Sequence, residues 1–116
     1  MRTSVLIVDD HAVFRAAARR LLESEGYVVV AEAPDGASAV EIARELRPEL
    51  ALVDIYLPDT DGFELASELA SLDWPPAVIL ISSRDRNELE LLVQDSAARG
   101  FLTKSVLSKE ALEEFV

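Results

Sequence analysis

The chain contains no cysteine. Disulfide bonds, zinc–thiolate sites and thiol catalysis are therefore excluded. Long apolar runs are also absent, since every hydrophobic stretch falls far short of the roughly 20 residues that a helix needs to cross a bilayer. Met1-Arg2-Thr3 leads directly into a short apolar run, without the pattern of a secretory signal peptide. We therefore expect a cytoplasmic protein that makes no contact with a membrane.

Basic residues are scarce. Eleven lysines and arginines stand against 22 aspartates and glutamates, which gives a formal net charge of −11. A protein that binds nucleic acid directly needs basic side chains to neutralise phosphates, so direct binding is not expected. Arg15, Arg19 and Arg20 do cluster at helical spacing, and we interpret them as a solvated helix face rather than a phosphate site. Any role on DNA would belong to another domain or another chain.

The 116 residues suffice for one domain. Short apolar segments alternate with segments of helical periodicity. Strands are predicted at 4–9, 27–32, 50–54, 77–82 and 100–103, and helices at 12–24, 36–47, 63–72, 85–98 and onwards from the N-cap Ser108. Three of the strand segments are continuously apolar, which is typical of strands covered on both faces. The alternation predicts a doubly wound α/β fold with a parallel sheet and right-handed crossovers.

Polar side chains stand where four of these strands end. Asp9 and Asp10 end the first strand, Asp54 ends the third, Ser82 ends the fourth and Lys104 follows the fifth. In an open parallel sheet, ligands bind beyond the carboxyl ends of the strands, so these five residues should converge on one edge. Each alone has a commonplace explanation as a helix cap, a turn residue or a surface lysine. Five together on one edge favour a site.

The residue types indicate phosphate chemistry. Three carboxylates repel one another unless a cation lies between them, and their oxygens suit Mg²⁺, which keeps positions open for phosphate. Lys104 offers a point charge to a phosphate, and the Ser82 hydroxyl offers a hydrogen bond. A carboxylate can itself be the nucleophile toward phosphorus. His11 is interpreted as a residue that begins the first helix close to these acids, rather than as a metal ligand or a catalytic base.

Over essentially its whole length the chain resembles the receiver domains of two-component response regulators. The residues that carry the resemblance are Asp9, Asp10, Asp54 with Pro58 and Gly62 four and eight positions later, Ser82 and Lys104. Phe101, three residues before the lysine, stands where the family has its switch aromatic. The Asp9-Asp10-His11 opening, followed by Val13-Phe14-Arg15, is most similar to the subfamily whose output is a LuxR-type helix-turn-helix.

The resemblance implies a flavodoxin-like domain, with five parallel strands in the order 2-1-3-4-5 and five helices. It implies that Asp54 accepts a phosphoryl group from the phosphohistidine of a sensor histidine kinase. It also implies a cofactor, Mg²⁺ or Mn²⁺, held by Asp9, Asp10, Asp54 and the backbone carbonyl of Tyr56. The domain would be a signalling module rather than an enzyme, although it would catalyse its own phosphoryl transfer and dephosphorylation.

Further roles follow from the same resemblance. Ser82 and Lys104 would contact the transferred phosphoryl group. Movement of Ser82 would make room for Phe101 to turn inward, which would alter the surface formed by the fourth helix, the fifth strand and the fifth helix. Tyr56 and Ser83 occupy the positions that govern the access of water to the phosphoryl group in this family.

The predicted last helix still runs at Val116. We therefore expect residues 1–116 to be a receiver domain that is followed, outside this chain, by an output domain. The output would be control of transcription, and DNA would be contacted only through that second domain. A homodimer formed on phosphorylation is a further expectation.

Two other functions fit parts of the sequence. A pseudo-receiver would keep the fold as a phosphorylation-independent interaction module, but such proteins usually lack an acid or the lysine, whereas this chain has all five groups. A small-molecule phosphotransferase or phosphatase that works through an aspartyl phosphate generally needs a second acid two residues after the nucleophile. This chain has Tyr56 at that position.

Overall fold

The computed structural model describes residues 2–83, 96–107 and 109–113 of the chain. Five parallel strands form one sheet in the order β2-β1-β3-β4-β5, which confirms the predicted topology. The strands are β1 (Ser4–Val8), β2 (Val28–Ala33), β3 (Leu50–Asp54), β4 (Ala77–Ser82) and β5 (Gly100–Thr103). Each one begins and ends within one residue of its predicted range.

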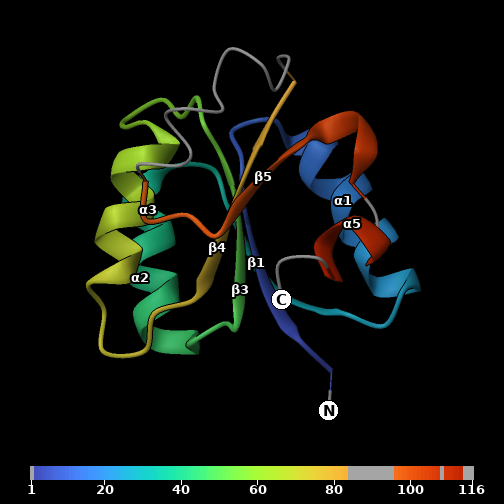
Figure 1. Cartoon of the computed structure of the whole chain (residues 1–116), viewed down its shortest axis with the longest axis horizontal. Helices are drawn as coiled ribbons and strands as arrows, with labels where there is room; N and C mark the ends of the chain where they lie inside the picture. Colours follow the sequence, from blue (N-terminus) through green and yellow to red (C-terminus); the bar gives the residue numbers. More distant parts are fainter. Residues whose placement is uncertain (1, 84–95, 108, 114–116) are drawn as a thin grey trace.

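Helices cover both faces of the sheet. Figure 1 shows α1 (Ala12–Ser24) and α5 (Lys109–Glu113) on one face, and α2 (Gly36–Leu46) and α3 (Gly62–Ala70) on the other. A short 3-10 turn, η2 (Lys104–Val106), joins β5 to α5. The helix predicted at 85–98 falls largely on residues 84–95, which lie outside the described residues, as does the predicted N-cap Ser108. Residues 96–98 are not helical.

The continuously apolar strands are explained by packing on both sides. Alternate side chains of a strand point to opposite faces of its sheet. In β1, Val5 and Ile7 enter the core layer beneath α1 and α5, whereas Leu6 and Val8 enter the layer beneath α2 and α3. β3 divides in the same way and is buried along its whole length. With both faces covered, the open edge at the strand ends is where polar groups gather.

The loop between β3 and α3 is tied to α2 in its middle and closed across its two ends. The Asp59 carboxylate accepts hydrogen bonds from the first two backbone N–H groups of α2, at 2.9 and 3.0 Å. The N–H of Gly62 donates to the carbonyl of Ile55 at 2.8 Å. A Cβ atom on Gly62 would lie 2.8 Å from the Asp54 carbonyl oxygen and 2.8 Å from the Ile55 Cα. The absent side chain therefore lets α3 begin directly against the end of β3, where Asp54 lies.

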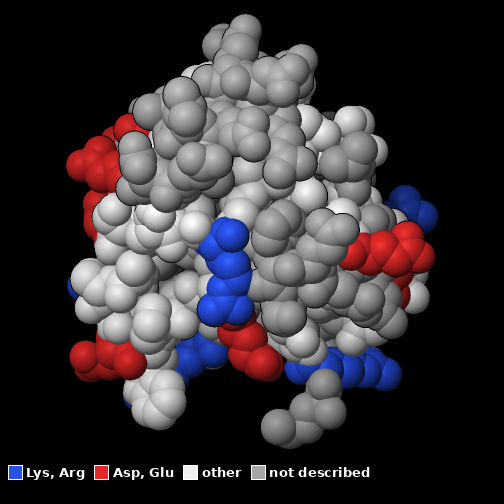
Figure 2. All heavy atoms as spheres, in the orientation of Figure 1, with Lys and Arg blue, Asp and Glu red and all other residues white. Residues whose placement is uncertain are grey.

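Charged side chains are spread over the surface. On the face shown in Figure 2, basic side chains are separated by acidic and uncharged ones, and those of the described residues form no basic patch there. The described residues on this face therefore offer a nucleic acid no extended basic surface. Within the described ranges, no helix is both long enough and apolar enough to cross a membrane.

Replacing Gly62 by alanine should lower the free energy of unfolding by about 1–3 kcal/mol, because the new Cβ would press on backbone that cannot move aside. Gly36→Ala is the matched control, since Gly36 also begins a helix capped by an aspartate. A Cβ there would meet the methyl group of Thr60 at 2.5 Å, and that side chain can rotate. We expect a loss below about 1 kcal/mol for the control. Urea denaturation measures both, and equal losses would contradict the steric argument.

Candidate functional site

The predicted site residues meet at the carboxyl edge of the sheet. The strand order reverses between β1 and β3, so Asp9, directly after β1, lies beside Asp54, the last residue of β3. In the next pair of strands Ser82 is opposite Thr103, which places Ser82 and Lys104 at the same edge. This point of reversal is where open α/β sheets bind their ligands. The convergence expected from the sequence is therefore present.

Asp9 lies at the centre of the cluster and is fully buried. Its Oδ1 accepts a hydrogen bond from the backbone N–H of His11 at 2.8 Å. Its Oδ2 makes no hydrogen bond within the described part of the chain, but the ammonium nitrogen of Lys104 lies 2.5 Å away. Because a buried charge is costly without a partner, the ion pair with Lys104 is what compensates this oxygen.

Lys104 is held by three contacts. Besides Asp9, its ammonium nitrogen lies 3.4 Å from Asp54 Oδ2 and 4.3 Å from the centre of the Phe14 ring. An ammonium group above an aromatic face is attracted by the electrons of the ring. Phe14 belongs to α1, whereas Lys104 follows β5, so the lysine reaches across the sheet edge toward the two acids. The side chain is 16% exposed, and its charge is thus a fixed part of the site.

Asp54 is a buried carboxylate with incompletely compensated charge. Its exposed fraction is 3%. Its Oδ1 accepts a hydrogen bond from the backbone N–H of Tyr56 at 3.3 Å. Burial raises the pKa of Asp54 above its ordinary value, and the nearby Asp9 carboxylate raises it further, while Lys104 and the Tyr56 N–H act in the opposite direction. A further positive charge at this position would therefore stabilise the ionised carboxylate.

The role of Arg15 is not visible in the sequence. The interpretation as a solvated helix face is wrong for this residue, because only 18% of its side chain is exposed. Its guanidinium donates to the backbone carbonyl of Asp9 at 2.6 Å and pairs with Glu32 at 3.2 Å. Glu32 also pairs with Arg19 at 2.7 Å. Arg20, the third arginine of the cluster, is exposed as predicted. Arg15 thus ties the peptide of Asp9 to α1 and β2.

The remaining predicted residues border the same edge. Ser82 is fully buried at the end of β4. Phe101 is 4% exposed and packs in the core layer beneath α2 and α3. Tyr56 is 47% exposed, and Ser83 is exposed as well. The two residues expected to govern water access therefore lie at the surface, and the two expected to form the switch lie inside.

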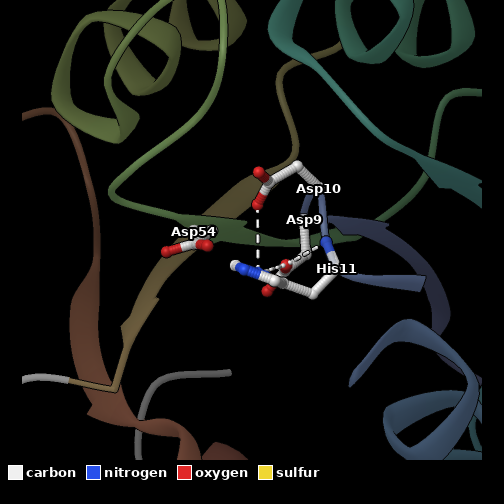
Figure 3. Close-up of side chains that lie close together, drawn as sticks. All are labelled: Asp9, Asp10, His11 and Asp54. Carbon is white, nitrogen blue, oxygen red and sulfur yellow. Dashed lines mark hydrogen bonds and ion pairs between the residues drawn. The ribbon is translucent and has the colours of Figure 1, made fainter. Parts of the chain in front are cut away.

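The acidic residues fit a divalent cation. One oxygen each of Asp9, Asp10 and Asp54 and one ring nitrogen of His11 all lie within 4.8 Å of one another (Figure 3). Asp10 is partly exposed, so the cluster opens to solvent on that side. Among the described residues, three carboxylates gather here, and the one ammonium group beside them, that of Lys104, contacts Asp9 and Asp54. Carboxylate oxygens grouped in this way are the ligands that Mg²⁺ and Mn²⁺ take.

This combination of a doubly wound parallel sheet with an acidic, lysine-bearing edge defines a class of small α/β domains that bind their ligands at the carboxyl ends of the strands. The profile of the response regulator receiver domain family matches residues 5–116, and the chain belongs to this family. The family inferred from the sequence is thereby confirmed.

Several known proteins are similar to this chain. The transcriptional regulatory protein PdtaR of Mycobacterium tuberculosis is 39% identical over 100 residues, which is 86% of this chain and 48% of that protein. The signal receiver domain of NarL from the same organism has a TM-score of 0.86 and 34% identity, covering 97% of this chain and 92% of that one. A LuxR-family two-component response regulator from Aurantimonas sp. SI85-9A1 has a TM-score of 0.86 and 30% identity, covering 97% and 81%. The likeness to LuxR-type regulators is thus confirmed as well. The chain spans about half the length of the curated relatives it matches.

Truncation of Arg15 tests the tie between α1 and the acidic edge. Arg15→Ala should lower the free energy of unfolding by about 1–2 kcal/mol, because it removes charged hydrogen bonds to Asp9 and Glu32. Arg20→Ala removes an equal charge from an exposed position of the same helix. It should change the free energy of unfolding by less than about 0.5 kcal/mol. Thermal or urea unfolding distinguishes the two, and an unchanged Arg15→Ala protein would refute the tie.

Removal of the Asp54 charge should stabilise the domain at neutral pH when no divalent cation is added. The pKa of Asp54 is higher in the folded protein than in the unfolded chain. The native state therefore binds the proton more tightly. The free energy of unfolding consequently falls as the pH rises from about 3.9, the unfolded value, through the raised native pKa, and the loss persists above it. Asp54→Asn should abolish this fall in the free energy of unfolding. Added Mg²⁺ should reduce the difference in stability between the variant and the wild type.

The measurement is urea unfolding in a chelator between pH 4 and pH 8, for the wild type and Asp54→Asn. Asp73→Asn serves as the control, because it removes the same charge from an exposed position. If Asp54→Asn is less stable than the wild type at pH 7.5 in chelator, the ionised Asp54 carboxylate does not destabilise the folded protein and the prediction is wrong.

Proposed function

We propose that this domain is a phosphorylatable receiver in which Asp54 accepts a phosphoryl group from the phosphohistidine of a sensor histidine kinase. The observation that carries the proposal is the buried Asp54 carboxylate at the sheet edge, 3.4 Å from the ammonium group of Lys104 and beside Asp9. A carboxylate can act as a nucleophile toward phosphorus when charge at the phosphoryl oxygens is stabilised. Membership of the receiver family supports the same assignment.

The carboxylates of Asp9, Asp10 and Asp54 and the backbone carbonyl of Tyr56 would hold Mg²⁺ or Mn²⁺. When bound, the ion supplies positive charge to the phosphoryl oxygens and offsets the repulsion among the three acids. The position of Tyr56 is restrained by its N–H bond to Asp54 and by an isolated antiparallel bridge to Asp61. The loop that carries the carbonyl is therefore ordered before a ligand arrives.

In the transfer, an Asp54 oxygen forms a bond to phosphorus while the bond from phosphorus to the kinase histidine breaks. The electron pair of the broken bond stays with the departing imidazole. Lys104, already directed at Asp54, would pair with a phosphoryl oxygen, and the Ser82 hydroxyl at the neighbouring strand end would donate a hydrogen bond to another. Hydrolysis of the acyl phosphate would return the carboxylate, with Tyr56 and Ser83 at the rim governing the approach of water.

Ser82 and Phe101 would transmit the change. Ser82 lies at the end of β4, and Phe101 lies on the neighbouring strand β5, opposite Leu80. The ring of Phe101 is buried, which is the inward position that the family resemblance assigns to the phosphorylated state. Phosphorylation would then shift the population toward this position, because the phosphoryl group binds one arrangement of Ser82 better than the other. The surface that responds includes β5 and α5.

We propose that an output domain with a LuxR-type helix-turn-helix follows residue 116 in the whole protein and that it contacts DNA in the cytoplasm. The length and the names of the curated relatives support this, since they are transcriptional regulators about twice as long as this chain. A homodimer formed on phosphorylation belongs to the same proposal. A pseudo-receiver, by contrast, gains no support, because all five groups needed for phosphotransfer meet at one edge.

Incubation with a small phosphodonor such as acetyl phosphate and Mg²⁺ tests the central step. Intact-mass analysis should show the gain of one phosphoryl group in the wild type and in the surface control Asp73→Asn. Asp54→Asn should show none, and a chelator should prevent the gain in every protein. Lys104→Ala should slow the reaction by about a hundredfold or more, because it removes a charge aimed at the reacting oxygens. A phosphoryl group gained by Asp54→Asn would refute the assignment.

A further inference from the structure

The side chain of His11 does not cap the helix that it begins. His11 is the N-cap of α1, with φ −96° and ψ 105°, so the expected position at the start of the helix is confirmed. An N-cap side chain normally accepts a hydrogen bond from the first turn of its helix, but His11 makes no such bond. Its ring turns instead toward the acids. Nδ1 lies 2.9 Å from Asp9 Oδ1 and 3.0 Å from Asp10 Oδ1 (Figure 3).

Three electron-rich atoms thus surround one small space. The imidazole nitrogen and the two carboxylate oxygens repel one another unless something positive lies between them. In the absence of a cation, a hydrogen on Nδ1 that is shared by the two oxygens fills that need. A divalent cation carries more charge and can bond all three atoms at once. The arrangement that accepts one shared hydrogen is therefore also arranged to accept a metal ion.

The spacing agrees with this. In an octahedral site with metal–ligand bonds of about 2.1 Å, neighbouring ligand atoms lie about 3.0 Å apart and opposite ones about 4.2 Å apart. The distances from His11 Nδ1 to Asp9 and Asp10 are 2.9 and 3.0 Å. With Asp54 included, the ligand atoms of the four residues all lie within 4.8 Å of one another. The set therefore lies within a space only slightly wider than the roughly 4.2 Å between opposite ligands of one ion.

The two oxygens of Asp9 have separate partners. Oδ2 faces Lys104, whereas Oδ1 faces the His11 ring and also accepts the His11 backbone N–H at 2.8 Å. The backbone bond sets the carboxylate relative to the residue that carries the imidazole. The lysine therefore does not stand between Oδ1 and the ring, and the Asp9 oxygen that lies away from the lysine is the one that faces His11.

We propose that the imidazole of His11 is a ligand of the cation that Asp9, Asp10 and Asp54 hold, and that it makes this site favour transition-metal dications over Mg²⁺. The inference rests on the metal-binding part of the proposed function. Imidazole nitrogen binds Mn²⁺, Co²⁺ and Ni²⁺ increasingly well and also suits Zn²⁺, whereas Mg²⁺ favours oxygen ligands. The chain has one histidine and no cysteine, so no thiolate or second imidazole can compete for such ions.

Pulsed electron paramagnetic resonance of Mn²⁺ bound to the whole chain gives a direct test. Nitrogen coupling to the bound ion should be present in the wild type, and labelling histidine alone with ¹⁵N should change it. Because His11 is the only histidine, the signal assigns the ligand without a variant. His11→Asn, which keeps a good N-cap residue, should still bind Mn²⁺ but lack the histidine coupling. Asp54→Asn should bind the ion more weakly and so locate it at this site.

Calorimetric titration with Mg²⁺ and Co²⁺ tests the preference. His11→Asn should weaken Co²⁺ binding by on the order of tenfold, and Mg²⁺ binding by less than about twofold. An equal loss of affinity for Co²⁺ and Mg²⁺ in His11→Asn would overturn the inference. It would also be overturned if Mn²⁺ bound at the site that Mg²⁺ occupies, shown by displacement, and gave no coupling to histidine nitrogen. Both of those results leave the proposed phosphoacceptor function intact. A wild-type protein that binds no divalent cation at millimolar concentration would overturn the inference and the metal-binding proposal together.

Discussion

The repulsion between the buried carboxylates of Asp9 and Asp54 is the constraint on which this edge of the molecule depends. Neither side chain can turn away to water, because the ends of β1 and β3 place both of them inside the fold. Burial and the neighbouring Asp9 carboxylate raise the free energy of the ionised Asp54 side chain. The surrounding elements preserve this arrangement: Gly62 brings α3 directly against the end of β3, and Arg15 holds the peptide of Asp9. The fold thus maintains an excess of negative charge that only a positive partner can relieve.

Lys104 relieves part of this charge, and its limits explain why a second positive group is needed. Its ammonium group lies against both Asp9 and Asp54. A phosphoryl group on Asp54 would carry roughly two negative charges in place of one and would compete with Asp9 for Lys104. The buried Oδ2 of Asp9 would then lose the one charge that compensates it among the described residues. A cation held by the acids would allow Lys104 to move without leaving that oxygen uncompensated. The proposed metal dependence of the transfer therefore follows from the number of charges as well as from the residue types.

The strands and the converging residues could be predicted from the sequence because both depend on local signals. Strands covered on two faces are continuously apolar, and parallel strands bring their carboxyl ends to one edge, so Asp9, Asp54 and Lys104 could be placed from the sequence alone. Contacts between side chains of distant segments leave no such signal. Arg15 meets Glu32 on another element, and its helical spacing suggested only a solvated face. The direction of the His11 ring was equally hidden, since a residue at a helix start can point into its helix or away from it.

Asp9 joins the two halves of the site. One of its oxygens faces Lys104, the proposed reader of the phosphoryl group, and the other faces His11, the proposed extra ligand of the cation. A cation that binds more strongly at Oδ1 withdraws negative charge from the whole carboxylate and weakens its hold on Lys104. The lysine then becomes more available to a phosphoryl oxygen. By thermodynamic linkage, a phosphoryl group that engages Lys104 must in turn favour the cation. If His11 determines which ion binds, the identity of that ion should therefore change how readily Lys104 pairs with a phosphoryl group on Asp54, because both effects pass through the Asp9 carboxylate.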